Sequence, residues 1–287
     1  MPNFIMLVGI PASGKDTFAC EYIKKHPDTI VHSSDDIREE LYGDASCQES
    51  PTKVFELMRS RTIRDLRAGK DVIYNATNLK YKNRKSILSQ VKKMTNAVCL
   101  CKILVAPIEV CKERNAKRER VVPDFVYDRM LKSFQVPFYG EGFDDIGIVK
   151  AWDGDSLEYM KVILEKVKEF GDQKNPHHTL SLQEHCQEAA RLAFKKGYDG
   201  ISAALHDIGK IYTQSFDEDG IAHYLNHGEV GSYLSLVMGF NLEIAQLINY
   251  HMLAYNYKGG EDAWRKRLGE ELWKKLEQLN ECDREAH

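Results

Sequence analysis

The feature that most constrains the fold of this chain is a glycine-rich loop directly behind an apolar run near its start. Residues 4–8 read Phe-Ile-Met-Leu-Val, which predicts a buried strand, and the segment that ends at residue 25 predicts a helix. The loop at 9–17 nearly matches G-x-x-x-x-G-K-[ST], in which backbone N–H groups bind phosphates and the lysine reaches the β and γ groups. The candidate nucleotide-binding residues are Gly9, Ser13, Gly14, Lys15, Asp16 and Thr17.

One residue of this loop departs from the pattern. Asp16 stands where a serine or threonine hydroxyl normally touches Mg²⁺. A carboxylate is a good hard ligand for Mg²⁺, so the ion could offset the repulsion between Asp16 and a triphosphate. Alternatively, Asp16 weakens nucleotide binding, or Thr17 or a water molecule does the work of the missing hydroxyl.

The order of apolar runs and helical segments predicts two domains in the 287 residues. Further strands at 72–74, 98–105 and 146–149 alternate with helices at 80–94, 108–118 and 156–169, which indicates an α/β domain with a parallel sheet and helices on both faces. The polar segment 171–176 contains glycine and proline and predicts a linker. Amphipathic stretches at 180–196, 200–210, 227–238, 242–254 and 261–284 then predict an all-α second domain. The expected domains are 1–170 and 177–287.

Charge separates the two halves and composition excludes some classes of protein. Residues 1–150 carry a net charge of +5 and could attract phosphates, whereas residues 151–287 carry −8. No apolar run is long enough for a membrane span, and the first residues lack the basic region of a signal peptide, so we expect a cytoplasmic protein with no membrane partner. The seven cysteines are scattered and odd in number, which favours reduced thiols.

Two polar clusters follow the phosphate loop. Asp35 and Arg38 come just after the apolar pair at 30–31, where a carboxylate at the carboxyl end of a strand points into the ligand crevice. Asp35 could take a proton from an attacking hydroxyl, although Ser34 or Asp35 could equally cap a helix at 36–42. The cations between 112 and 120 lie at three-to-four spacing before Pro123; they could close over phosphates as a lid, or form a solvated helix face.

These motifs together resemble the 5′-hydroxyl polynucleotide kinase family over roughly residues 1–150. The matching segments, in order, are 9–17, 34–38, 76–79, Arg114-Asn-x-x-Arg118 and Val122-Pro123. The resemblance implies that ATP, with Mg²⁺, phosphorylates the 5′-OH of RNA or DNA. It makes Lys15 and the arginines at 114 and 118 phosphate ligands, Asp35 the general base and Arg38 a contact to the acceptor phosphate. A phage end-healing enzyme typifies this family. The chain departs from it at Ala76, where that enzyme has an acidic residue.

The second half concentrates histidines and aspartates in separate segments. Imidazole with carboxylate is a ligand set suited to Mn, Fe, Co or Ni, although a lone histidine is more often a surface or satisfied core residue. The order His, His-Asp, Asp resembles the HD phosphohydrolase superfamily over about 177–287. The resemblance implies one or two metal ions, with Asp207 as the bridging ligand. Lys210 either binds the substrate phosphate or interacts favourably with the dipole at a helix end. The implied metal ligands are His185, His206, Asp207, His227, His251 and Asp283.

Three functions follow from these resemblances. The first is a bifunctional end-healing enzyme of RNA repair, which phosphorylates a 5′-OH, removes a 2′,3′-cyclic, 2′ or 3′ phosphate and shares its pathway with an RNA ligase. The second is a nucleoside or metabolite kinase fused to a nucleotidase. The third is a nucleotide-sensing adaptor whose kinase site has decayed at Asp16. Base-stacking aromatics would favour nucleic acid, and Phe134, Phe138 and Tyr139 are the candidates.

Overall fold

A computed structural model describes the chain except for residues 48, 177–178, 254–259 and 287. The chain divides into two compact units, Met1–Tyr127 with Pro137–Trp152 and Asp128–Val136 with Asp153–His287. Each unit is described by itself. None of the helices in the described ranges is both long and apolar enough to cross a membrane.

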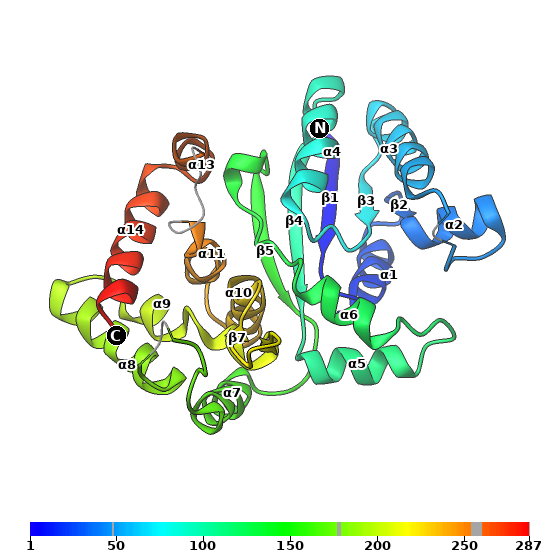
Figure 1. The fold of residues 1–287 in the computed structure, drawn as a ribbon. Coiled ribbons are helices and arrows are strands. Elements are labelled where there is room, and N and C mark those ends of the chain that lie inside the picture. The colour runs from blue at the N-terminus through cyan, green and yellow to red at the C-terminus, as the bar shows by residue number, and fades with distance from the viewer. Residues whose placement is uncertain (48, 177–178, 254–259, 287) are drawn as a thin grey trace. The chain divides into compact units, whose positions relative to one another are not determined.

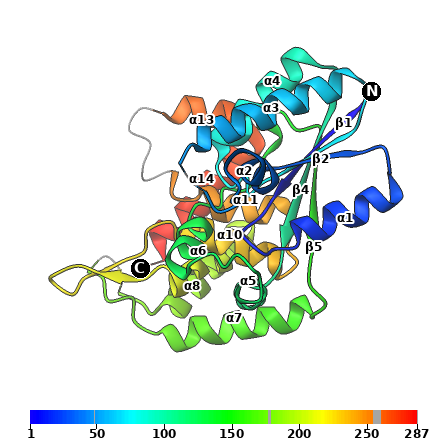
Figure 2. The same cartoon turned by 90° about the vertical axis from the view of Figure 1, so that its right-hand side faces the viewer.

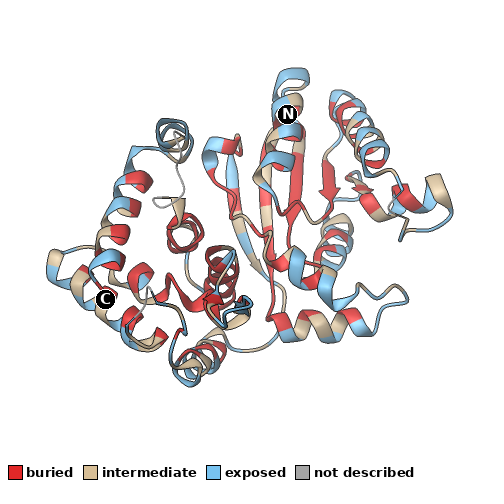
Figure 3. Ribbon diagram, viewed as in Figure 1, coloured by how far each residue is buried: buried red, intermediate tan, exposed pale blue. Residues whose placement is uncertain are grey.

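The first unit is built on a five-stranded parallel sheet in the order β2-β3-β1-β4-β5 (Figure 1). Its central strands are buried on both sides, which explains their continuous apolar sequence (Figure 3). The predicted parallel α/β fold is confirmed. The strands are β1 (Asn3–Val8), β2 (Ile30–Ser33), β3 (Val72–Asn75), β4 (Val98–Val105) and β5 (Asp145–Lys150).

Helices connect these strands and flank the sheet, as the side view shows (Figure 2). The long helix at 51–67 had no counterpart among the sequence predictions. Helix α6 begins in the first unit and ends in the second, since the unit boundary falls after Tyr127. The helices are α1 (Lys15–Lys25), α2 (Ser34–Tyr42), α3 (Pro51–Arg67), α4 (Tyr81–Met94), α5 (Ile108–Ala116), α6 (Asp124–Leu131) and the 3-10 turn η1 (Tyr139–Glu141).

A buried ion pair fixes the loop after β3. Arg84 and Glu141 are fully buried, and their side chains pair at 2.6 and 2.8 Å. Arg84 also donates to the carbonyl oxygens of Asn78 and Leu79 at 3.0 and 2.8 Å. Asn78 in turn donates to the carbonyl of Leu7 in β1. This network holds the 76–79 segment against the sheet.

The second unit is almost entirely helical, as predicted, with one added hairpin, β6 (Ser215–Phe216) and β7 (Ala222–His223). Two predicted helices are interrupted: the one at 200–210 breaks at His206, and the one at 261–284 breaks at Gly269. The prediction at 242–254 ends partly outside the described residues. The elements are α7 (Ser156–Phe170), α8 (Leu182–Lys196), α9 (Gly200–Leu205), the 3-10 helix η2 (Ile208–Tyr212), α10 (His227–Val237), α11 (Leu242–Tyr250), α13 (Glu261–Leu268) and α14 (Glu270–Glu285).

The compact units do not coincide with the predicted domains. Helix α7, expected to close a first domain at residue 170, lies in the second unit, where it packs on α8 and η2. The predicted linker 171–176 lies within the same unit, and Asp172 there forms a β-bridge with Ser181. The limits of 1–170 and 177–287 stay predictions, and residues 177 and 178 fall outside the described part of the chain.

Candidate functional sites

The phosphate loop has the backbone that its glycines predict. A Cβ on Gly9 would lie 2.4 Å from Ser13 Oγ and 2.8 Å from the carbonyl oxygen of Leu104, so no other residue fits there. Gly14 caps α1 at a φ of 95°, a left-handed conformation that favours glycine. The hydroxyl of Ser13 is buried with no hydrogen-bond partner among the described residues. An unpaired buried donor in this loop fits an anion such as a phosphate.

Lys15 lies inside the loop. Its Nζ donates to the carbonyl oxygens of Gly9 and Ile10 at 3.0 and 2.8 Å. Burial lowers the pKa of Lys15 to about 8, although the nearby carboxylate of Asp16 acts in the opposite direction. A partly desolvated ammonium held only by neutral carbonyls gains strongly from a phosphate placed beside it.

The carboxylate of Asp16 has two polar neighbours. Its carboxylate accepts a hydrogen bond from Asn75 Nδ2 at 2.8 Å, and the guanidinium of Arg118 lies 3.7 Å away. Its side chain is still 73% exposed, so it remains reachable by a cation. Asn75 was missed by the sequence analysis, although its place at the end of β3 is where ligand-facing residues occur.

The structure corrects the helix-cap reading of Ser34 and Asp35. Ser33 is the N-cap of α2, and its hydroxyl accepts the N–H groups of Asp35 and Asp36. The carboxylate of Asp35 instead pairs with Arg38 at 2.8 Å. The side chain of Asp35 is 43% exposed, so a substrate hydroxyl can reach it.

Two arginines approach Asp35 from different segments. Arg38 is buried, and its Nε has no partner among the described residues. Arg120, one of the cations of the predicted lid, lies 3.3 Å from the Asp35 carboxylate. A buried guanidinium with an unused N–H fits a phosphate oxygen.

The predicted lid helix is shorter than expected. It ends at Ala116, so Arg118 and Arg120 lie on the segment that follows and not along one helix face. Arg114 donates to the carbonyl of Ala151 at 2.9 Å. Tyr127 in α6 donates to the carbonyl of Pro11 at 3.2 Å, which ties the residues behind the lid to the phosphate loop.

The aromatic candidates for base stacking are mostly wrong. Phe134 is fully buried and meets Tyr233 edge-on, while Phe138 is buried and stacks on Tyr81. Both are core residues. Tyr139 alone of the three is exposed.

The second candidate site gathers four histidine side chains in the second unit. In each, Nδ1 lies 2.7–2.8 Å from a backbone carbonyl oxygen, which holds the ring and turns Nε2 inward. Metal-binding histidines typically use one nitrogen in this way. The pairs are His185 with Ala286, His206 with Ala203, His227 with Tyr224 and His251 with Ile248.

The two aspartates join these imidazoles into two groups. His185, His206 and Asp283 have ligand atoms within 4.8 Å of one another, and so do Asp207, His227 and His251. Asp283 Oδ1 is 3.1 Å from His185 Nε2 and 3.2 Å from His206 Nε2.

Asp207 faces both groups. Its Oδ2 lies 3.4 Å from Nε2 of both His185 and His206, and its Oδ1 lies 3.1 Å from His227 Nε2 and 3.8 Å from His251 Nε2. This is the bridging position that the HD resemblance implies. The close approach depends on Gly209, since a Cβ there would lie 2.0 Å from the carbonyl oxygen of His227.

The electrostatics of this cluster fit a divalent cation. Burial opposes charge on His185, but its hydrogen bonds to Asp207 and Asp283 raise its pKa to about 10. Burial also lowers the pKa of His251 to about 3, and the neighbouring His227 acts in the same direction. The negative charge of the two buried carboxylates is offset by Lys210 and a protonated His185, and a bound divalent cation could take over this role.

Lys210 points into the same cluster. Its Nζ pairs with Asp207 Oδ2 at 2.6 Å and donates to Gln173 Oε1 at 2.7 Å. Lys210 lies in the last turn of η2, where the dipole explanation applies, and it is also buried against the cluster. Gln173 was assigned to the linker, and no sequence pattern indicated it.

Two parts of the chain match known families. Residues 4–137 match the family described as AAA domain, and residues 176–285 match the family described as HD domain. Among curated proteins, an L-seryl-tRNA(Sec) kinase of Methanococcus maripaludis is 27% identical over 185 residues, which cover 60% of this chain and 67% of that protein.

Solved structures are also similar to part of the chain. A chain of the Pnkp1/Rnl/Hen1 RNA repair complex is 23% identical with a TM-score of 0.42, over 46% of this chain and 43% of that one. A fungal RNA kinase is 12% identical with a TM-score of 0.42, over 59% of this chain and 86% of that one. This chain thus covers less than half the length of the matched chain from the RNA repair complex.

Proposed function

We propose that the chain, which matches an AAA domain over residues 4–137 and an HD domain over residues 176–285, is a bifunctional enzyme that heals nucleic-acid ends. The kinase would transfer the ATP γ-phosphate to a 5′-OH. The HD domain would hydrolyse a 2′,3′-cyclic, 2′ or 3′ phosphate. Broken RNA carries both defects, so one polypeptide with both activities would prepare its ends for an RNA ligase.

The observation that carries the kinase proposal is the pairing of Asp35 with Arg38 beside the phosphate loop. Asp35 would take the proton of the attacking 5′-OH, whose oxygen then bonds to the γ-phosphorus as ADP leaves. Arg38 would bind the phosphate that follows the acceptor nucleoside. Lys15 and Arg118 would neutralise charge on the transferred group. Gly9, Ser13, Gly14 and Thr17 would complete the ATP site, with Asp16 near Mg²⁺.

The hydrolase proposal rests on the convergence of four Nε2 atoms on the two oxygens of Asp207. His185, His206 and Asp283 would hold one ion, and His227 and His251 a second across Asp207. Bound ions of this kind activate water and polarise a phosphate ester. Lys210, already buried beside the cluster, would exchange its contact with Asp207 for one with the substrate phosphate. The mixed nitrogen and oxygen set suits Mn, Fe, Co or Ni.

A second candidate is favoured by the similarity to an L-seryl-tRNA(Sec) kinase. Such a protein phosphorylates a hydroxyl that is carried on an RNA, and the same crevice could accept a seryl-tRNA or a free metabolite. The fused HD domain favours end healing, since it supplies the complementary phosphatase.

One assay separates these candidates. The protein is incubated with γ-labelled ATP and, in parallel, a 5′-OH RNA oligonucleotide, the matching DNA, nucleosides and L-seryl-tRNA. Label on the 5′ end of an oligonucleotide supports the proposal. Label only on nucleosides, or only on the seryl group, overturns it.

A further inference from the structure

The positive charge of the first unit is concentrated in one segment. Residues 51–94, which form α3, β3 and α4, contain twelve Lys and Arg and three acids, a net charge of +9. The other residues of 1–150 contain thirteen Lys and Arg and seventeen acids, a net charge of −4. The basic character of this half therefore comes from the helix pair and not from the phosphate loop.

Two adjoining hollows run between α3 and α4. The inner one, of about 180 Å³, is lined by residues of both helices and by Tyr74, Thr77 and Asn78 at the carboxyl end of β3. The outer one is a shallow groove over the later turns of the two helices. Arg59 lines both, so the two hollows adjoin at this side chain. The outer groove is lined by Glu56, Arg59, Ser60, Ile63, Arg64, Arg67, Gln90 and Met94.

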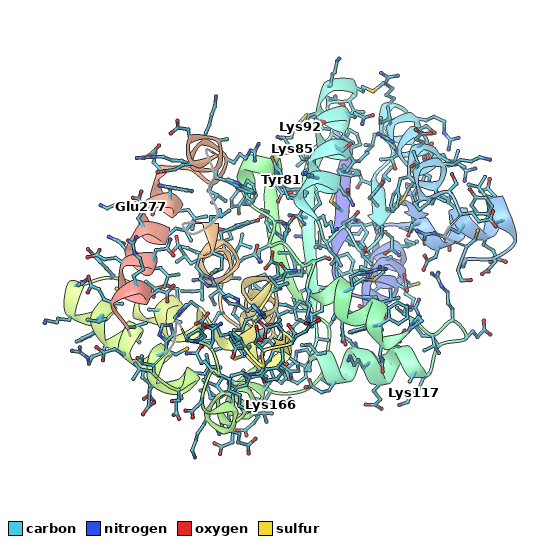
Figure 4. All side chains as sticks on the ribbon, in the orientation of Figure 1. Tyr81, Lys85, Lys92, Lys117, Lys166 and Glu277 are labelled. Atoms are coloured by element: carbon cyan, nitrogen blue, oxygen red, sulfur yellow. The ribbon has the colours of Figure 1, made fainter. Side chains whose placement is uncertain are left out.

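The two walls of this α3/α4 groove differ in chemistry. The α3 wall presents three arginines, at 59, 64 and 67, and the acid Glu56. Arg64 is paired with the carboxylate of Asp65 at 2.7 Å, and Arg67 Nε donates to the carbonyl oxygen of Met94 at 3.0 Å. The α4 wall presents uncharged side chains, among them Asn83, Ser86 and Gln90. The lysines of α4 at 85 and 92 are used on another flank, where they bind the carbonyl of Glu141 and the carboxylate of Asp144 (Figure 4).

The inner end of the groove lies against the kinase crevice. The carbonyl oxygen of Thr77 accepts the N–H of Gly9, the first residue of the phosphate loop, at 3.1 Å. From Phe55 at this end to Arg67 at the other, α3 rises by about 18 Å. A strand that starts in the crevice can therefore continue along the groove for more than one nucleotide.

We propose that the α3/α4 groove binds the sugar-phosphate backbone of a single strand downstream of its 5′-OH. This inference rests on the proposed kinase function and extends it from the end of the strand to its body. The arginines of α3 face the phosphates, and the amides and hydroxyls of α4 face the sugars and bases without selecting a sequence. A charged helix face that only contacts water would not be expected to line a hollow or to lie opposite an uncharged wall.

The test compares acceptors of different length. Arg59 has no ion pair or hydrogen bond among the described residues, so Arg59→Gln should leave folding unchanged. Arg67→Gln removes one exposed hydrogen bond, from Arg67 Nε to the carbonyl oxygen of Met94, so urea unfolding of the double variant is compared with that of the wild type. We expect Arg59→Gln with Arg67→Gln to raise KM about tenfold for an acceptor of about ten nucleotides, with kcat unchanged. KM for a dinucleotide acceptor should not change. The slope of log affinity against log salt should fall by about 1.4 in magnitude, since each lost phosphate contact contributes about 0.7.

The matched control removes the same charge elsewhere in the segment. Lys53 and Lys93 are exposed and line neither hollow, so Lys53→Gln with Lys93→Gln should leave the long acceptor unaffected. Equal losses in the control, equal losses for both acceptor lengths, or no loss at all would overturn the proposal.

Direct binding separates this proposal from the kinase proposal. Fluorescence anisotropy of the same single strand is measured with the wild type and both double variants, without ATP. One outcome is that no acceptor is phosphorylated, yet the strand binds and the double variant Arg59→Gln with Arg67→Gln binds it more weakly. This result would support the groove proposal and refute the kinase function. If acceptors are phosphorylated and this variant binds the long strand as the wild type does, the groove is refuted alone.

Discussion

The burial of Lys15 predicts that ATP binding depends on pH in the weakly alkaline range. With a pKa of about 8, the ammonium is about nine-tenths protonated at pH 7 and about one-tenth at pH 9. Deprotonation removes the positive charge, so affinity falls as pH rises. If only the protonated form holds the phosphates, the Kd for ATP should rise about tenfold between these values, which is about 1.4 kcal/mol.

Titration calorimetry with a nonhydrolysable ATP analogue and excess Mg²⁺ measures this change. Lys15→Arg is the control, because a guanidinium stays charged across the whole range. Its Kd should vary less than about twofold between pH 7 and 9. A wild-type Kd that is flat, or an equal rise in Lys15→Arg, would refute the argument from burial and assign the dependence to another group.

Three further outcomes are expected. Asp35→Asn should lower kcat for 5′ phosphorylation by about 10²–10⁴ with little change in the Kd for ATP, because it removes a general base; an unchanged kcat would contradict that role. Asp207→Ala should lose most of the bound metal, measured by plasma mass spectrometry, because Asp207 faces both ligand groups, whereas His206→Ala and His227→Ala should each lose only part of it; complete loss in either histidine variant would contradict two separate positions. Glu141→Gln should destabilise the first unit by about 3–5 kcal/mol in urea unfolding, because it leaves Arg84 charged and buried; a shift below about 1 kcal/mol would contradict the buried-pair argument.

The sequence predicted the architecture of the first unit because its signals are local. A buried apolar strand, a glycine-rich loop and a helix need only adjacent residues, and each appears in the structure at nearly the expected bounds. The cap of α2 was misassigned by one residue, because Ser33 and Ser34 are chemically alike and only the backbone distinguishes them.

Contacts between distant segments could not be read from the chain. The carboxylate of Asp16 meets Asn75, and Lys210 meets Gln173, through tertiary packing that no local pattern encodes. The same holds for the backbone carbonyls that orient the four histidines. The grouping of His185 with Asp283 was implied only by resemblance, and the structure places their side chains 3.1 Å apart.

The most direct test of two independent activities uses one RNA with a 5′-OH and a 2′,3′-cyclic phosphate. It is incubated with ATP, Mg²⁺ and Mn²⁺, and both ends are followed by mass spectrometry for the wild type, Lys15→Ala and Asp207→Ala. The wild type should phosphorylate the 5′ end and remove the 3′-terminal phosphate. Lys15→Ala should lose only the first reaction and Asp207→Ala only the second. An RNA that is unchanged at both ends by the wild type, or a loss of both reactions in either variant, would contradict the account.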